Sequence, residues 1–499
     1  MSSRRLVQLL VSAAVAVSLL ASPVVAAAAA EPIAPERLDA WITERMDAHG
    51  IPGAAVAVVQ GGRTVHLGGY GSADGADRPV TETTPFLIGS ASKPFTANVV
   101  LQLVDEERLS LDEPAWPYIS DFVPSPPDGF EDATIRQLLT HTAGLGMSVG
   151  LPGTVPVHTS ADALERRVAD MLAQPLAAPP GERYEYANSG YAVLAAVVEQ
   201  VTGQRFDEVL RERILDPLGM QDTFATDDHP AASRLASGHR QWFGSWRPAD
   251  LPFDRAGVAY GYLGSTAADL ATFLQAHFDG ESPAIPRSAA QIADGPTMPS
   301  GWDLPLEANQ GLGWMVDELA GHQVVSHAGS LGHFTTHLIL VPGADDLGIA
   351  VATNASAFVA AGHTSQYDLS VGLTELLLGQ EGAVETASPL TVLVAPIVTW
   401  LLLAALVGLA VRHLVTTLPR WRRAAATGTG RRWLRRVVLP AAGWLSLALG
   451  LSLSLPLGAA RHFYPDVGWA ATAIVAVALP WAVIRTAVTI AALRPRATA

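Results

Sequence analysis

A serine and a lysine stand three positions apart at Ser90 and Lys93. Lys93 is the only lysine in the 499-residue chain, which otherwise uses arginine for its basic residues. An arginine stays protonated in proteins, whereas a buried lysine can lose its proton and then accept one from a neighbouring hydroxyl. Residues i and i+3 lie on one face of a helix. The spacing therefore predicts that Ser90 is a nucleophile and that Lys93 is its base.

Two further segments carry groups that suit such chemistry. Tyr186 and Asn188 combine a phenol that can transfer protons with an amide that can both donate and accept hydrogen bonds. His327, Gly329 and Ser330 follow an apolar run that is typical of a strand, and the glycine would let a substrate approach the backbone closely. Neither pattern is specific by itself.

The elements that must position these residues are strands at both ends of a long segment and helices in its middle. Apolar runs predict strands, and apolar residues spaced three and four apart predict helices. The simplest assembly is an α+β fold in which one antiparallel sheet is flanked by helices and carries an inserted helical lobe. The site is expected in the cleft between sheet and lobe. We expect strands at 54–59, 64–71, 324–327, 334–341 and 347–353, helices at 35–48, 134–139, 161–174, 189–202, 206–218, 267–278 and 365–378 and after Ser90, and helix caps at Ser160 and Thr266.

In this order, the three segments resemble the pattern of the class C β-lactamase and D,D-peptidase group of serine hydrolases, which also includes many esterases. That pattern is Ser-x-x-Lys, then Tyr-x-Asn, then Lys-Thr-Gly or His-x-Gly. The stretches 111–114, 138–145 and 311–314 also match the usual text of the group. The resemblance covers about residues 35–380 and implies a β-lactamase/transpeptidase-like fold.

The resemblance also implies catalytic roles. Ser90 would attack a carbonyl and form an acyl-enzyme, while Lys93 and Tyr186 would share the work of the base. Which of the two takes the first proton is left open. Tyr186 would then help to protonate the leaving group and to activate the water that removes the acyl group.

The resemblance also implies that four residues bind the substrate. Asn188 would contact both Lys93 and a substrate amide, and His327 and Gly329 would line the cleft. The backbone N–H groups of Ser90 and Ser330 would form an oxyanion hole, which usually contributes the largest stabilisation of the transition state.

The sequence departs from the family pattern where carboxylate-binding members carry Lys-Thr-Gly or His-Thr-Gly. Here His327 stands at the lysine position, and Ala328 lacks the threonine hydroxyl. This weakens the case for binding the free carboxylate of a β-lactam or of D-Ala-D-Ala, and favours an ester, amide or peptide without that group.

Composition excludes several classes of protein. There is no cysteine, so disulfides, thiol catalysis and thiolate metal sites are excluded. His327, His333 and His337 share no metal-site spacing with a carboxylate, and we expect neither a metal nor a cofactor. Residues 31–380 hold 44 acidic and 18 basic residues, a balance that disfavours nucleic acid as a partner.

The two ends of the chain predict export and a membrane anchor. Residues 1–30 have the charged, apolar and small-residue regions of a signal peptide. Residues 381–389 form a short linker, and apolar stretches at about 390–411, 438–459 and 467–491 are each long enough to span a bilayer. The arginine-rich loop between the first two spans is expected in the cytoplasm, which places residues 31–380 outside.

The sequence therefore predicts a multi-pass protein of the cell membrane with an extracytoplasmic serine hydrolase domain at 31–380. Its expected partners are the lipid bilayer and a small-molecule or peptidoglycan-derived substrate, and peptidase, β-lactamase and esterase activities all remain open. An alternative is a ligand sensor or penicillin-binding scaffold that is acylated at the same serine without turnover. A transporter is disfavoured, because the predicted spans contain almost no polar groups.

Overall fold

The computed structural model describes residues 33–380 except for 148, 152–155, 159, 161, 244, 281, 286–297, 300–305, 307–308 and 357–364. It also describes parts of 394–412 and residues 457–463 and 465–493. The predicted signal peptide, the linker 381–389 and nearly all of the predicted span 438–459 lie outside the described residues.

An antiparallel sheet joins the two ends of the domain, as the sequence predicts. The strand β1 (Gly53–Gln60) pairs with β2 (Arg63–Gly71) on one side and with β12 (Leu347–Thr353) on the other. The sheet has eight strands in the order β2-β1-β12-β11-β10-β9-β8-β7. Its remaining strands are β11 (Thr335–Val341), β10 (His322–Ser330), β9 (Met315–Leu319), β8 (Asn309–Gln310) and β7 (Met298–Pro299).

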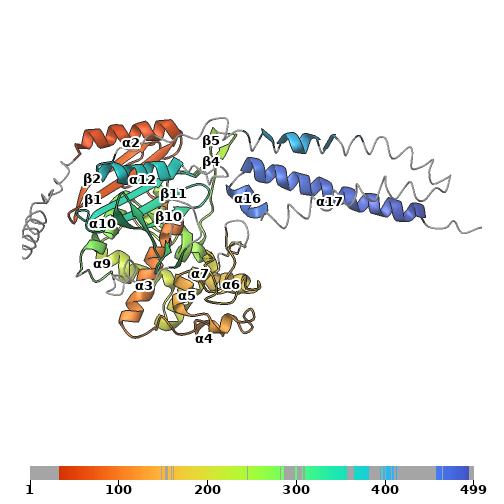
Figure 1. Ribbon diagram of the computed structural model, residues 1–499, viewed down its shortest axis with the longest axis horizontal. Helices are drawn as coiled ribbons and strands as arrows, with labels where there is room; N and C mark the ends of the chain where they lie inside the picture. Colours follow the sequence, from red (N-terminus) through yellow and green to blue (C-terminus); the bar gives the residue numbers. More distant parts are fainter. Residues whose placement is uncertain are drawn as a thin grey trace, which may run out of the picture.

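Both faces of the sheet are covered (Figure 1). In β1, the side chains of Ala54, Val56 and Val58 pack into one apolar cluster and those of the alternate residues pack into the other, because successive residues of a strand point to opposite faces. One face carries α2 (Pro35–His49) and α12 (Ser365–Leu377). The other carries α10 (Ala267–Phe278), with α3 (Lys93–Asp105) and the helical lobe beyond it.

The helical lobe lies in the middle of the chain, as expected, but its helices are shorter. The predicted helix 206–218 is divided by a π-turn at Arg211–Leu215. The expected cap at Ser160 is wrong: α6 begins at Ala163, and the Ser160 hydroxyl donates to the Asp162 carboxylate instead of accepting from a helix N–H. The lobe contains α4 (Trp116–Ile119), α5 (Ile135–Leu139), α6 (Ala163–Leu172), α7 (Asn188–Thr202), α8 (Phe206–Leu210) and α9 (Asp216–Leu218).

Several short strands were not predicted. The strand β3 (Phe86–Leu87) comes just before the Ser90 turn and pairs with β6 (Gly264–Ser265). A second small sheet contains β13 (Ala355–Ser356), β4 (His239–Trp242) and β5 (Ser245–Pro248). Strands of two to four residues are too short for an apolar period to identify them.

The C-terminal region contains α16 (Leu457–Phe463) and α17 (Pro465–Leu493), and α17 extends away from the domain (Figure 1). Among the described residues, one helical stretch, Pro465–Val483, is long and apolar enough to cross a membrane. The prediction of three spans is not confirmed, because the described residues contain a single candidate, at the third position.

Candidate active site

Ser90 lies in a tight 3-10 turn, Gly89–Ser92, that leads from β3 into α3. The Ser92 hydroxyl donates to the Gly89 carbonyl at 2.7 Å and so braces the turn. Ser90 itself is half-buried, so its hydroxyl remains accessible to a substrate. Pro94 falls in the first turn of α3, where a missing N–H costs little.

Lys93 is fully buried, and its amine faces Ser90. Nζ lies 3.0 Å from Ser90 Oγ, 2.8 Å from Asn188 Oδ1 and 3.0 Å from the Tyr260 carbonyl oxygen. Burial lowers the pKa of Lys93 well below its usual 10.5, because a charged amine is poorly solvated in the interior.

Tyr186 comes to the same place from the lobe. Lys93 Nζ lies 4.7 Å from the centre of the Tyr186 ring, and Asn188 is the first residue of α7. His141 supports the loop before α7: its Nδ1 accepts a hydrogen bond from Ala187 N at 3.1 Å, and its ring lies 4.4 Å from that of Tyr186. The structure thus places His141 as a brace of the loop before α7.

The end of β10 packs directly on the Ser90 turn. A Cβ added to Gly329 would lie 2.0 Å from the Ile88 carbonyl oxygen and 2.9 Å from Ser90 N. Gly329 is therefore needed for the close approach of two backbones. The next residue, Ser330, ends β10 beside this contact, and its hydroxyl is 2.8 Å from that of Ser356.

His327 is buried and neutral. Burial, with a smaller contribution from the nearby Lys93 amine, lowers its pKa to about 3. His327 Nδ1 lies 2.8 Å from the Ala328 carbonyl oxygen. The pKa of His141 is also lowered well below 6.5 by burial. Neither imidazole carries positive charge at neutral pH, so neither attracts a substrate carboxylate.

All seven sequence-predicted residues gather in this region. One Asn188 N–H is already used, because Nδ2 donates to the Gly150 carbonyl at 3.1 Å. The contact between the Tyr260 carbonyl and Lys93 was not predicted from the sequence. Every residue has a backbone carbonyl, so the residue type gives no sign of this contact. Within the described part of the chain, no group of three His, Asp or Glu side chains is placed to hold a metal ion.

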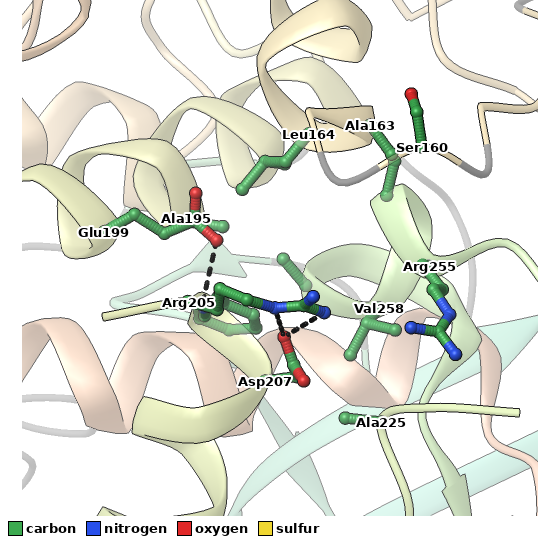
Figure 2. Close-up of a pocket in the computed structure, with 13 residues that line it drawn as sticks. Ser160, Ala163, Leu164, Ala195, Glu199, Arg205, Asp207, Ala225, Arg255 and Val258 are labelled. Atoms are coloured by element: carbon green, nitrogen blue, oxygen red, sulfur yellow. Dashed lines mark hydrogen bonds and ion pairs between the residues drawn. The ribbon is translucent and has the colours of Figure 1, made fainter. Parts of the chain in front are cut away.

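A cavity of about 220 Å³ lies away from Ser90, between α6, α7 and the segment 255–259 (Figure 2). Leu164, Glu199, Arg205, Arg255 and Val258 are among the residues that line it. None of the predicted site residues lines it.

Residues 38–372 match the model of the Beta-lactamase family, and the chain belongs to that family. Proteins of this family that it resembles are serine hydrolases, and the chain is an enzyme of that class. It is 31% identical to penicillin-binding protein 4 of Amycolatopsis lactamdurans over 319 residues, which are 62% of this chain and 81% of that protein. It is 35% identical to esterase EstB of Burkholderia gladioli over 198 residues, which are 37% of this chain and 50% of the esterase.

Solved structures show the same fold. The octameric penicillin-binding protein homologue from Pyrococcus abyssi aligns with a TM-score of 0.58 and 28% identity, over 69% of this chain and 78% of that one. A D-stereospecific amidohydrolase from Streptomyces aligns with a TM-score of 0.54 over 66% of this chain and 97% of its own. At 24% identity, this second likeness shows the fold alone.

Proposed function

We propose that this protein is a membrane-anchored extracytoplasmic hydrolase that cleaves an ester or amide through an acyl-enzyme on Ser90. The observation that carries the proposal is the environment of the Lys93 amine. Its neighbours Asn188 Oδ1 and the Tyr260 carbonyl oxygen can only accept hydrogen bonds. A neutral amine gives its two N–H groups to these oxygens and turns its lone pair toward the Ser90 hydroxyl, 3.0 Å away.

The reaction begins when the Ser90 proton moves to Lys93 Nζ or, through Lys93, to Tyr186. Oγ then bonds to the substrate carbonyl carbon, and the N–H groups of Ser90 and Ser330 stabilise the resulting oxyanion. Tyr186 returns the proton to the leaving alcohol or amine as its bond to carbon breaks. Water, which gives a proton to the same groups, then bonds to the acyl carbon. The bond from that carbon to Ser90 Oγ breaks, Oγ takes the proton back, and the acid is released.

We infer the substrate class from two residues of β10. Ala328 supplies no hydroxyl, and His327 is neutral, so a group without a carboxylate fits beside β10 better than the free carboxylate of a β-lactam. The relatives include a protein named as an esterase, and that name supports an ester substrate here.

Membrane anchoring is supported by the apolar stretch Pro465–Val483 and by contacts that hold its start against the domain. His462 Nε2 lies 2.6 Å from the Leu331 carbonyl oxygen, next to Ser330. The Phe243 N–H donates to the Asp466 carboxylate at 3.0 Å. We infer from these contacts that Ser330 lies near the base of α17 and that the substrate is one found at the membrane surface or in the cell wall next to it.

The proposal is tested by labelling the full-length protein with a fluorophosphonate probe and a fluorescent penicillin, with wild type and Ser90→Ala in parallel. We expect the fluorophosphonate to label wild type only, with turnover of p-nitrophenyl esters and slow or no penicillin labelling. Equal labelling of both forms would remove Ser90 from its role. Rapid, stable penicillin labelling would contradict the substrate class, and acylation without turnover would favour the sensor.

A further inference from the structure

The Tyr260 carbonyl that faces Lys93 belongs to a segment, Arg255–Tyr262, outside all three sequence motifs. Three side chains from the start of the nucleophile helix hold on to this segment and its next residue. The Thr96 hydroxyl donates to the Ala259 carbonyl at 2.7 Å, Lys93 binds the Tyr260 carbonyl, and Leu263 N donates to the Ser92 hydroxyl at 3.3 Å. The backbone of 259–263 is therefore the surface that locates the lysine amine.

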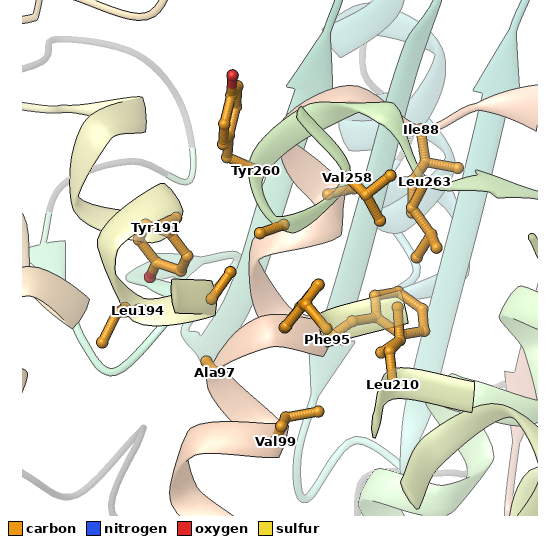
Figure 3. Packing of buried hydrophobic residues seen from close by; sticks show 14 of the residues in the cluster. Ile88, Phe95, Ala97, Val99, Tyr191, Leu194, Leu210, Val258, Tyr260 and Leu263 are labelled. Atoms are coloured by element: carbon orange, nitrogen blue, oxygen red, sulfur yellow. The ribbon is translucent and has the colours of Figure 1, made fainter. Parts of the chain in front are cut away.

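One buried guanidinium holds both ends of this segment. Arg167, on α6, donates through NH2 to Asp254 Oδ2 at 2.7 Å, just before the segment begins. Its NH1 donates to the Tyr260 hydroxyl. The Arg167 side chain is 1% exposed and that of Asp254 is 4% exposed. Figure 3 shows the Tyr260 ring as part of the apolar cluster, with its hydroxyl directed away from Phe95.

The cavity of Figure 2 lies between α6 and the segment, and it is lined by Ala163 and Leu164 from α6 and by Ala256, Val258 and Ala259 from the segment. Val258 and Ala259 also pack in the large apolar cluster of the domain. Arg167 is the charged side chain that crosses from α6 to Asp254 and to the Tyr260 hydroxyl.

The buried ion pair between Arg167 and Asp254 is expected to add little to the stability of the fold. Arg167 Nε and Asp254 Oδ1 are buried without a hydrogen-bond partner. Taking two charges out of water costs free energy that their attraction often fails to recover, and apolar residues of similar volume frequently stabilise such a site equally well. A positional role accounts for the retention of this pair better than a stabilising one.

We propose that Arg167 is a positioning residue for catalysis: through Asp254 and the Tyr260 hydroxyl, it holds the Tyr260 carbonyl against Lys93 Nζ and so keeps the amine aligned with Ser90. The inference rests on the role of Lys93 proposed above. Arg167 does not touch the substrate, so it acts on the rate of acylation and leaves substrate binding unchanged.

The test uses Arg167→Met in the full-length protein, with Arg167→Lys, Asp254→Asn and Tyr260→Phe as milder variants that keep the shape of the site. The matched control is Arg45→Met. Arg45 makes a similarly buried pair with Asp368 at 2.9 Å, but it joins α2 to α12 on the opposite face of the sheet. Each variant is assayed for kcat and KM on a p-nitrophenyl ester, for its rate of fluorophosphonate labelling, and for its Tm.

We expect Arg167→Met to lower kcat and the labelling rate by about 10- to 100-fold at unchanged KM, a loss within the range of a misaligned base. Arg167→Lys restores part of the rate, while Arg45→Met lowers Tm and leaves kcat unchanged. A folded Arg167→Met with wild-type kcat would overturn the inference, as would equal effects of Arg167→Met and Arg45→Met. If Arg167→Met does not fold, Asp254→Asn and Tyr260→Phe decide the question. A wild-type kcat in both of these variants would also overturn the inference. Turnover that survives in Ser90→Ala would instead remove the proposed function itself.

Discussion

A methyl group placed on Gly89 would lie 2.6 Å from the backbone nitrogen of Ser330. Gly89 also adopts φ +58°, a left-handed conformation that residues with a Cβ rarely adopt. The two N–H groups proposed for the oxyanion hole thus belong to backbone segments, distant in the sequence, that touch without side chains between them. Small changes at this contact should act directly on the transition state.

Gly89→Ala is expected to lower kcat by about 10²- to 10³-fold, because the added methyl group separates Ser330 N from the Ser90 turn. The measurement is kcat on a p-nitrophenyl ester, with Tm to follow folding. Gly343→Ala is the matched control: its φ is +76°, but no atom lies within 4 Å of the added Cβ. That variant should lose a little stability and keep its activity. A Gly89→Ala enzyme with wild-type kcat would contradict the proposed oxyanion hole.

Tyr186→Phe is expected to lower kcat by about 10²- to 10⁴-fold, because it removes a proton-transferring hydroxyl and keeps the ring. Tyr191→Phe provides the comparison. Lys93 Nζ also lies near the Tyr191 ring, at 5.5 Å, but the Tyr191 hydroxyl donates to the Leu139 carbonyl at 3.0 Å. Steady-state kinetics should therefore show a large loss in the first variant and a small one in the second. Similar losses in both would mean that Tyr186 has no special role.

The dependence of kcat/KM on pH should report the base. Burial lowers the pKa of Lys93 well below 10.5, and the reaction needs its neutral form. The rate on an uncharged ester therefore rises as Lys93 loses its proton, and this rise is complete well below pH 10.5. A single rise centred near the ordinary lysine pKa would show that Lys93 is charged in the resting enzyme and is not the base.

The domain should lose stability as the pH falls from about 6.5 toward 4. Burial lowers the pKa of His327 and His337 to about 3 and that of His277 to about 4, so the folded protein keeps them neutral while the unfolded chain binds protons. Each group can lower the free energy of unfolding by up to about 2 kcal/mol at pH 5. Thermal unfolding between pH 7 and pH 5 checks this, and His277→Gln should reduce the slope. A flat profile would mean that these imidazoles are not buried.

The proposed topology can be mapped with single cysteines, because the chain has none of its own. Asp346→Cys, in an exposed hairpin of the domain, should react with a membrane-impermeant maleimide on intact cells. Thr427→Cys, in the arginine-rich stretch, should react only after the membrane is permeabilised. Labelling of Thr427→Cys in intact cells, or recovery of the protein in the soluble fraction, would refute the anchor.

The sequence by itself determined the fold class and the side chains that gather at the site. Ser90 and Lys93 are three residues apart, so local helical geometry is sufficient to predict their contact. The β1–β2 hairpin and β12 were predictable for a similar reason, because apolar runs with turn residues between them are local signals. The family could also be predicted from the order of the three motifs, because that order can be read from the residue types alone.

Tertiary structure alone decided how the amine of Lys93 is held. The Tyr260 carbonyl, the Arg167–Asp254 pair and the contact of Gly89 with Ser330 N all join segments that are distant in the chain. A backbone carbonyl is present in every residue, so its use as a partner leaves no mark in the sequence. Burial depends on every neighbouring element at once, and it is burial that lowers the pKa of Lys93 and favours the neutral amine that the proposed mechanism needs.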